Sequence, residues 1–121
     1  MHRCGKLVLN WVTAMERLPG ERIAKLTKLL VDAARPKRII LFGSQARHAA
    51  AEDSDLDIMV VQDAPSDRFA EMVRLNRLLR SFEIPVDLLV VSEEKFQYWR
   101  DTPGNVYFEA AWEGQVLYEA A

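Results

Sequence analysis

The stretch LFGSQARHAAAEDSDLDIMVV, from Leu41 to Val61, decides the fold of this chain. An apolar run stops at Gly-Ser, and a second apolar run carries two aspartates, Asp55 and Asp57, spaced by one residue. The first run predicts a buried strand that ends in a tight turn, and the second predicts another strand. Carboxylates are rarely buried without a partner, so two of them in such a strand indicate a functional role.

The rest of the 121 residues predicts a single α/β (α+β) domain in which helices cover a sheet. Strands are expected at 38–42, 56–61, 86–91 and 115–119. Helices are expected at 7–18, at 21–34, after Ser44, from 67 to about 82 with Ser66 as its cap, at 93–99 with Ser92 as its cap, and around 105–114. We divide the domain into N-terminal helices at about 6–34, a catalytic core at about 37–92 and a helical, aromatic segment at 93–121.

Composition excludes several classes of protein. Cys4 is the only cysteine, so neither a disulfide framework nor a cysteine metal cluster is expected, and a cytoplasmic location is the default. The apolar runs are far shorter than the roughly 20 residues that cross a bilayer, and the N-terminal MHRCGKLVLNWVTAM is interpreted as a helix and not a signal peptide. Residues 1–48 carry a net charge of +7 and residues 49–121 carry −9, which gives opposed solvated faces but no tail for nucleic acid.

The spacing of the acids predicts a metal site. Side chains two residues apart on a strand point to the same face, so Asp55 and Asp57 lie together if Leu56 and Ile58 face the core. Two adjacent carboxylates repel each other unless a cation lies between them, and Mg²⁺ prefers such oxygen ligands. Asp87 lies in a similar apolar run, VDLLVV, and on a neighbouring strand it would complete a three-carboxylate site for two metal ions.

The Gly-Ser turn predicts an anion site next to these acids. Gly43 permits a tight turn and close backbone approach, and Ser44 can cap the helix that follows. The free N–H groups at that helix start would bind phosphate, with Arg47 one turn further on. Together with the acids, this turn predicts a site for a nucleoside triphosphate.

These residues resemble a known motif. GSQARHAAAEDSDLD, residues 43–57, is similar to the G-S-x-A-R-G-x-A-x-x-x-S-D-x-D motif of the minimal nucleotidyltransferases, in the DNA polymerase β superfamily. The resemblance in element order runs from about Glu21 to the closing GQVLYE, with VDLLVV as the third metal-binding strand. It implies a nucleotidyltransferase fold with a small mixed sheet, two Mg²⁺ ions, and transfer of a nucleoside monophosphate with release of pyrophosphate.

By matching positions, the resemblance assigns roles to individual residues. Gly43 and Ser44 would take the triphosphate of ATP, Asp55 and Asp57 would bind metal, and Asp87 would bind the catalytic metal and help to activate the acceptor hydroxyl. His48 departs from the motif, which has glycine there. Since no metal ligand or phosphate contact is lost, this departure affects the geometry of the loop more than the activity.

The resemblance also suggests an acceptor. Small members of this family look like antitoxins that add AMP to a tyrosine of a HEPN-domain toxin. Two alternatives stay open: transfer to a small molecule with the help of another subunit, and neutralisation of the partner by binding alone. No contact with nucleic acid or membrane is expected, and a hetero- or homo-oligomer is compatible with the sequence.

The C-terminal segment is rich in aromatic residues. Most of them are expected to cover the sheet, while an exposed subset would suit a partner interface. Trp11 could take either role. The aromatic residues are Phe96, Tyr98, Trp99, Tyr107, Phe108, Trp112 and Tyr118.

Overall fold

A computed structural model describes residues 5–7, 20–43, 56–81 and 85–120 of the chain, and side chains from residue 23 onward. The strands are β1 (Gly5–Leu7), β2 (Arg38–Phe42), β3 (Leu56–Gln62), β4 (Val86–Ser92) and β5 (Gln115–Ala120). The helices are α1 (Gly20–Ala34), α2 (Arg68–Leu78) with the 3₁₀ turn η1 (Leu79–Ser81), α3 (Glu93–Trp99), and α4 (Val106–Phe108) with the π-helical turn η2 (Glu109–Glu113).

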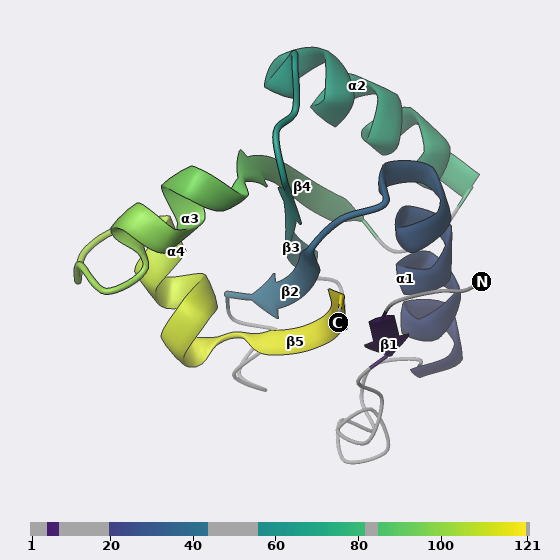
Figure 1. Cartoon of the computed structure of the whole chain (residues 1–121). Helices are drawn as coiled ribbons and strands as arrows, with labels where there is room; N and C mark the ends of the chain where they lie inside the picture. The colour runs from purple at the N-terminus through teal and green to yellow at the C-terminus, as the bar shows by residue number, and fades with distance from the viewer. Residues whose placement is uncertain (1–4, 8–19, 44–55, 82–84, 121) are drawn as a thin grey trace.

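The strands form one mixed sheet in the order β1-β5-β2-β3-β4 (Figure 1). β3 and β4 are parallel, and the other neighbouring pairs are antiparallel. A crossover through α2 joins the two parallel strands, as parallel pairing requires. This mixed α/β architecture confirms the predicted fold class.

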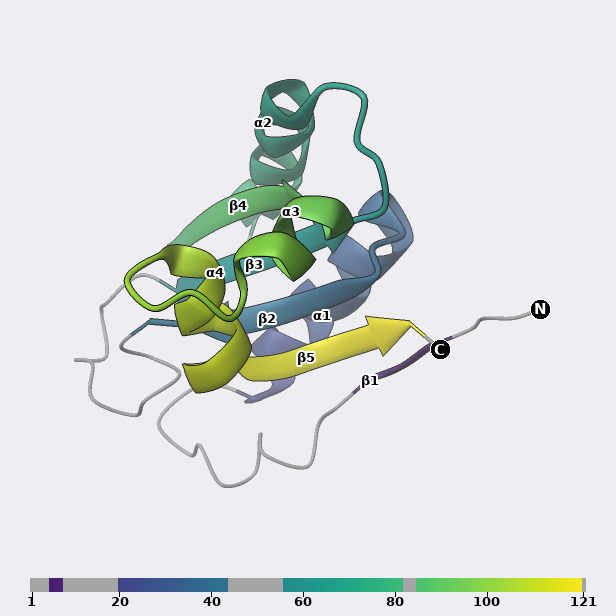
Figure 2. The same ribbon diagram turned by 60° about the vertical axis from the view of Figure 1, so that its left-hand side comes forward.

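Helices cover both faces of the sheet, with α3 and α4 in front of the strands in Figure 2 and α1 behind them. Alternate residues of each strand supply the two cores. On the α1–α2 face, Leu56, Ile58 and Val60 of β3 pack in one cluster with residues of both helices. On the α3–η2 face, Met59 and Val61 pack in a second cluster, which includes Phe96 and Ala110.

Most of the predicted elements are present, with two corrections. All four predicted strands form, and α3 begins after its Ser92 cap, whose side chain accepts from the Lys95 N–H. The helix expected from about residue 6 is wrong at its start, because residues 5–7 pair with β5 as an edge strand; residues 8–19 lie outside the described part. The cap of α2 is Asp67 and not Ser66, since the Asp67 carboxylate accepts from the Ala70 N–H at 3.0 Å.

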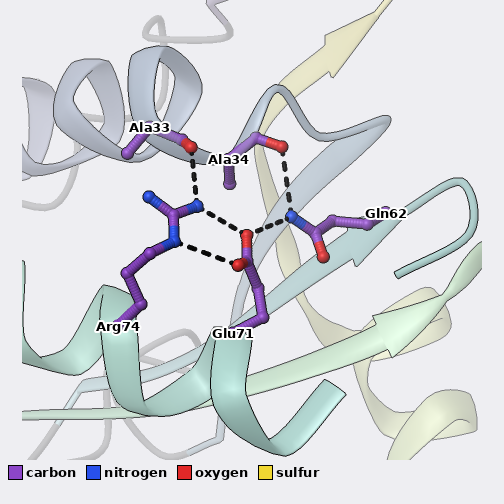
Figure 3. A network of polar contacts seen from close by, with 5 residues as sticks. All are labelled: Ala33, Ala34, Gln62, Glu71 and Arg74. Atoms are coloured by element: carbon purple, nitrogen blue, oxygen red, sulfur yellow. Dashed lines mark hydrogen bonds and ion pairs between the residues drawn. The ribbon is translucent and has the colours of Figure 1, made fainter. Parts of the chain in front are cut away.

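A polar network ties α1, β3 and α2 together at the end of the sheet where β3 finishes (Figure 3). The last carbonyl groups of α1 accept hydrogen bonds from Arg74 (to Ala33, 2.8 Å) and from Gln62 (to Ala34, 3.1 Å). Glu71 accepts from both donors and so holds them in place. Its hydrogen bonds with Arg74 lower the pKa of Glu71 and raise that of Arg74. A helix C-terminus favours a cation, so the network caps α1.

Within the described part of the chain, no helix combines the length and apolar character that spanning a bilayer would take.

Candidate active site

Two of the three predicted metal ligands are neighbours in the sheet. Asp57 of β3 and Asp87 of β4 are direct partners in the parallel register, one residue into each strand. In-register positions of adjacent strands are separated by about 4.8 Å, and their side chains point to the same face. Asp57 is half-buried and Asp87 is exposed, so the pair lies at the border between core and solvent.

The end of β2 completes this corner of the sheet. Phe42, the last residue of β2, is the antiparallel partner of Asp57, and Gly43 follows it directly. Gly43 has a φ of +80°, and a Cβ at this position would lie 2.3 Å from Oδ2 of Asp57. Only glycine fits, for two separate reasons: the left-handed backbone and the carboxylate against its Cα. Gly43 and the acidic strand β3 are therefore in contact.

The pair faces the side of the sheet covered by α3, α4 and η2. Asp57 lies on the same face as Met59 and Val61, two and four residues further along β3, which pack with Phe42 in the α3–η2 cluster. The opposite face of β3 is the apolar one that the sequence predicted, with Leu56 and Ile58 fully buried. The structure therefore shows the expected alternation from Leu56 to Val61, and the position of Asp55 beside Asp57 stays a prediction.

The donor set fits a hard divalent cation. Two carboxylates at adjacent in-register positions repel each other, and a cation bound between them removes that repulsion. The absence of a side chain at Gly43 lets the Asp57 carboxylate lie against the backbone at the end of β2. Among the described residues, no group of three or more His, Cys, Asp or Glu side chains is placed to hold a metal. The third predicted acid, Asp55, lies outside them.

Three of the six predicted site residues are thus brought together: Gly43, Asp57 and Asp87. Ser44, Arg47 and Asp55 lie outside the described part of the chain, as does His48. The sequence did not predict that Gly43 packs against Asp57. The signal that could have shown it was the pair itself: a glycine directly after one predicted strand and an acid near the start of the next.

A cavity of about 330 Å³ lies at the other end of β3. Its lining includes Gln62, Asp63 and Glu71, and it contains none of the predicted site residues. The carboxylate corner and this cavity are separated by the length of a seven-residue strand, so they are distinct places on the molecule.

The fold and this corner define a class: an α/β protein with a mixed sheet, paired aspartates on parallel strands and a glycine turn beside them. Comparison with known proteins agrees. Residues 24–121 match the family described as "Polymerase beta, Nucleotidyltransferase". A candidate protein adenylyltransferase of Methanocaldococcus jannaschii is 36% identical over 84 residues, which cover 69% of this chain and 80% of the relative.

Solved structures are similar as well. A candidate nucleotidyltransferase from Sulfolobus solfataricus has a TM-score of 0.51 at 24% identity, covering 72% of this chain and 78% of its own. A toxin–antitoxin structure with AMP-PNP has a TM-score of 0.55 at 23% identity, covering 85% of this chain and 75% of that one. A mutant of the toxin–antitoxin MntA–HpeT has a TM-score of 0.54 at 25% identity, covering 79% of this chain and 72% of that one.

The chain belongs to the polymerase beta nucleotidyltransferase family. It is therefore an enzyme of the nucleotidyltransferase class, as the motif at residues 43–57 predicted.

Proposed function

We propose that this protein transfers AMP from ATP, with Mg²⁺, to a tyrosine hydroxyl of a partner HEPN-type toxin, and that it acts as the antitoxin of that pair in the cytoplasm. The observation that carries the proposal is the corner where Asp57 and Asp87 occupy paired positions of β3 and β4 and Gly43 packs against Asp57. Support for the acceptor comes from the relatives: one carries the name of a protein adenylyltransferase, and two similar structures are toxin–antitoxin assemblies, one of them with an ATP analogue.

In this proposal, Asp57 and Asp87 hold the metal together with Asp55. Bound Mg²⁺ would neutralise phosphate charge and stabilise the charge that develops during in-line displacement. Gly43 gives the triphosphate close access to the backbone, and Ser44 and Arg47 would bind its oxygens.

Asp87 also has a role in the attack of the acceptor hydroxyl. The tyrosine oxygen bonds to the α-phosphorus, the bond from that phosphorus to the β-phosphate bridging oxygen breaks, and pyrophosphate leaves. Asp87 is the more exposed of the described pair, so it is the one placed to meet an incoming hydroxyl and to accept its proton.

The test is transfer of label from α-labelled ATP to a tyrosine of a HEPN-domain toxin, with Mg²⁺ present. Asp57→Asn and Asp87→Asn should each lower the rate by at least about 100-fold, the loss typical when a dominant electrostatic contribution is removed. Asp63→Asn is the matched control, because Asp63 is exposed just beyond the opposite end of β3 and should leave the rate unchanged.

Two results would overturn the proposal. If label reaches only a small molecule, the acceptor is not a protein. If no label is transferred, yet the Asp87→Asn variant still inhibits the toxin, the protein neutralises its partner by binding alone.

A further inference from the structure

An aromatic surface lies on the same side of the sheet as the carboxylate pair, formed by Tyr98, Trp99, Phe108 and Trp112. Of these, Tyr98 is 73% exposed, Trp112 is 61% exposed and Trp99 is 40% exposed, and all belong to α3, α4 or η2. Their rings pack in two pairs. The ring centroids of Tyr98 and Trp99 are 4.9 Å apart in an edge-to-face arrangement, and those of Phe108 and Trp112 are 6.2 Å apart. Exposed aromatic groups of this kind mark binding surfaces more often than chance.

Hydrogen bonds hold this surface in place. The indole N–H of Trp112 donates to the carbonyl of Arg100 at 3.0 Å, which ties η2 to the segment after α3. Asn105 caps α4 by accepting from the Phe108 N–H, and it donates to the carbonyls of Thr102 and Trp99. The Trp112 indole and the backbone that carries Trp99 and Phe108 are therefore held by hydrogen bonds, which lowers the entropy cost of association.

The position of the surface connects it with the active site. In both views of the ribbon, α4 and η2 lie toward the end of the sheet where β2 finishes (Figures 1 and 2). Val106 and Tyr107 of α4 pack on the cluster that contains Phe42, the strand partner of Asp57. A protein segment bound on the aromatic surface would thus approach the carboxylate corner.

The charge of this region identifies the kind of partner. Residues 93–114 contain five acidic and two basic side chains, and because Glu93 forms an ion pair with Arg38 of β2, a net charge of −2 remains when that arginine is included. Glu94 and Asp101 are exposed near Tyr98, and Glu109 and Glu113 flank Trp112 along η2. Aromatic faces beside carboxylates attract guanidinium and ammonium groups through cation–π contacts and charge. A negative surface also disfavours nucleic acid and anionic membranes.

We propose that the aromatic surface binds an arginine- or lysine-rich segment of the acceptor protein and so brings its hydroxyl to the carboxylate corner. The proposal rests on the proposed function for the identity of the acceptor, but not for the binding itself. The opposite face offers a matched control: Phe69 on α2 is 74% exposed, yet α2 packs on the other side of the sheet.

The experiment measures binding in the absence of ATP and Mg²⁺, so that failure of transfer and failure of docking are separate outcomes. The probe is a short labelled peptide that alternates arginine with tyrosine, compared by fluorescence anisotropy with the same peptide carrying glutamate in place of arginine. We expect the arginine peptide alone to bind, more weakly at high salt. Trp112→Ala and Tyr98→Ala should each raise Kd about tenfold or more, whereas Phe69→Ala should leave it unchanged.

Equal binding of the two peptides would overturn the proposal, as would native affinity in both the Trp112→Ala and Tyr98→Ala variants. Both side chains are largely exposed, so these variants are expected to fold, which circular dichroism checks. Sedimentation gives one more decisive outcome. If Trp112→Ala converts a dimer into a monomer, the surface joins two copies of this chain and does not bind the acceptor.

Discussion

At the scale of single residues, Gly43 joins the two halves of the site. Its backbone has a positive φ directly after β2, and its missing side chain makes room for the carboxylate of Asp57. One residue therefore satisfies a backbone requirement and a chemical one. The sequence motif contains the same glycine, but the packing reason for it is visible only in the folded chain.

We predict that Gly43→Ala lowers the rate of nucleotidyl transfer by about 100-fold, because the new Cβ displaces the Asp57 carboxylate, and a misplacement of about 1 Å costs roughly that much. Gly104→Ala is the control. Gly104 also has a positive φ, +94°, but no atom lies within 4 Å of its added Cβ. Both variants should lose about 1 kcal/mol of stability through backbone strain, Gly43→Ala somewhat more because of its contact with Asp57, and only Gly43→Ala should lose the rate. Parallel rate and unfolding measurements decide this, and an equal loss of rate in both would contradict it.

Arg35 is strained in a similar way at the end of α1. It has a φ of +47° and its N–H donates to the carbonyl of Val31 at 3.0 Å, the arrangement in which helices usually place glycine. We predict that Arg35→Gly raises the free energy of unfolding by about 0.5–1 kcal/mol in urea denaturation. Arg77→Gly should act in the opposite direction by about 1 kcal/mol, since Arg77 lies inside α2. A loss of stability in Arg35→Gly would show that the arginine side chain outweighs the strain.

At the scale of elements, the network around Glu71 joins α2 to the end of α1. Apolar packing is not the only interaction that holds the helices there, because the side chains of Gln62 and Arg74 donate hydrogen bonds to the last carbonyl groups of α1. The sequence showed these residues only as polar positions on separate elements. Their partners are separated by 28 to 41 residues along the chain, so periodicity could not reveal them.

We predict a pH dependence of stability from Glu71. The pKa of Glu71 is lowered in the folded state, chiefly by its hydrogen bonds with Arg74, so the carboxylate stabilises the fold fully above the ordinary value of 4.5. This stabilisation is lost as the pH falls through the lowered pKa. Glu71→Gln should cost about 1–2 kcal/mol at neutral pH and flatten the decrease of stability in acid.

Urea unfolding at a series of pH values, compared with native protein, measures both effects. Glu94→Gln serves as the control, because Glu94 is exposed on α3 and should change stability by only a few tenths of a kcal/mol. If the curves of Glu71→Gln and the native protein stay parallel into acid, the network does not depend on the charge of Glu71.

At the scale of the whole molecule, the two faces of the sheet carry different groups of residues. The α1–α2 face holds the larger apolar cluster and the polar network. The α3–η2 face carries the carboxylate pair at one end and the aromatic surface beside it. The expected aromatic interface is thus divided: Phe96 is 1% exposed and Tyr118 is 7% exposed, and both belong to the core, while Tyr98, Trp99 and Trp112 face solvent.

The strands of the sheet and the class of the protein could be predicted from the amino-acid sequence. Apolar runs broken by Gly, Pro and Ser predict β2 to β5, because a strand buried on both faces needs continuous apolar side chains. The Gly43–Asp57 motif predicts the chemistry, because its residues are close in the chain and their spacing sets which face each side chain takes. The family match confirms that class.

The tertiary structure alone decided what depends on distant pairing. Residues 5–7 were expected to begin a helix, but they form a strand because the edge of β5 supplies their hydrogen-bond partners. Asp87 lies 30 residues after Asp57, and only the parallel register of β3 and β4 makes them neighbours. The sequence by itself determined the class of protein and predicted, through local spacing, which groups carry the chemistry. The fold decided which of them meet, because contacts between remote segments follow from sheet order and packing and not from spacing along the chain.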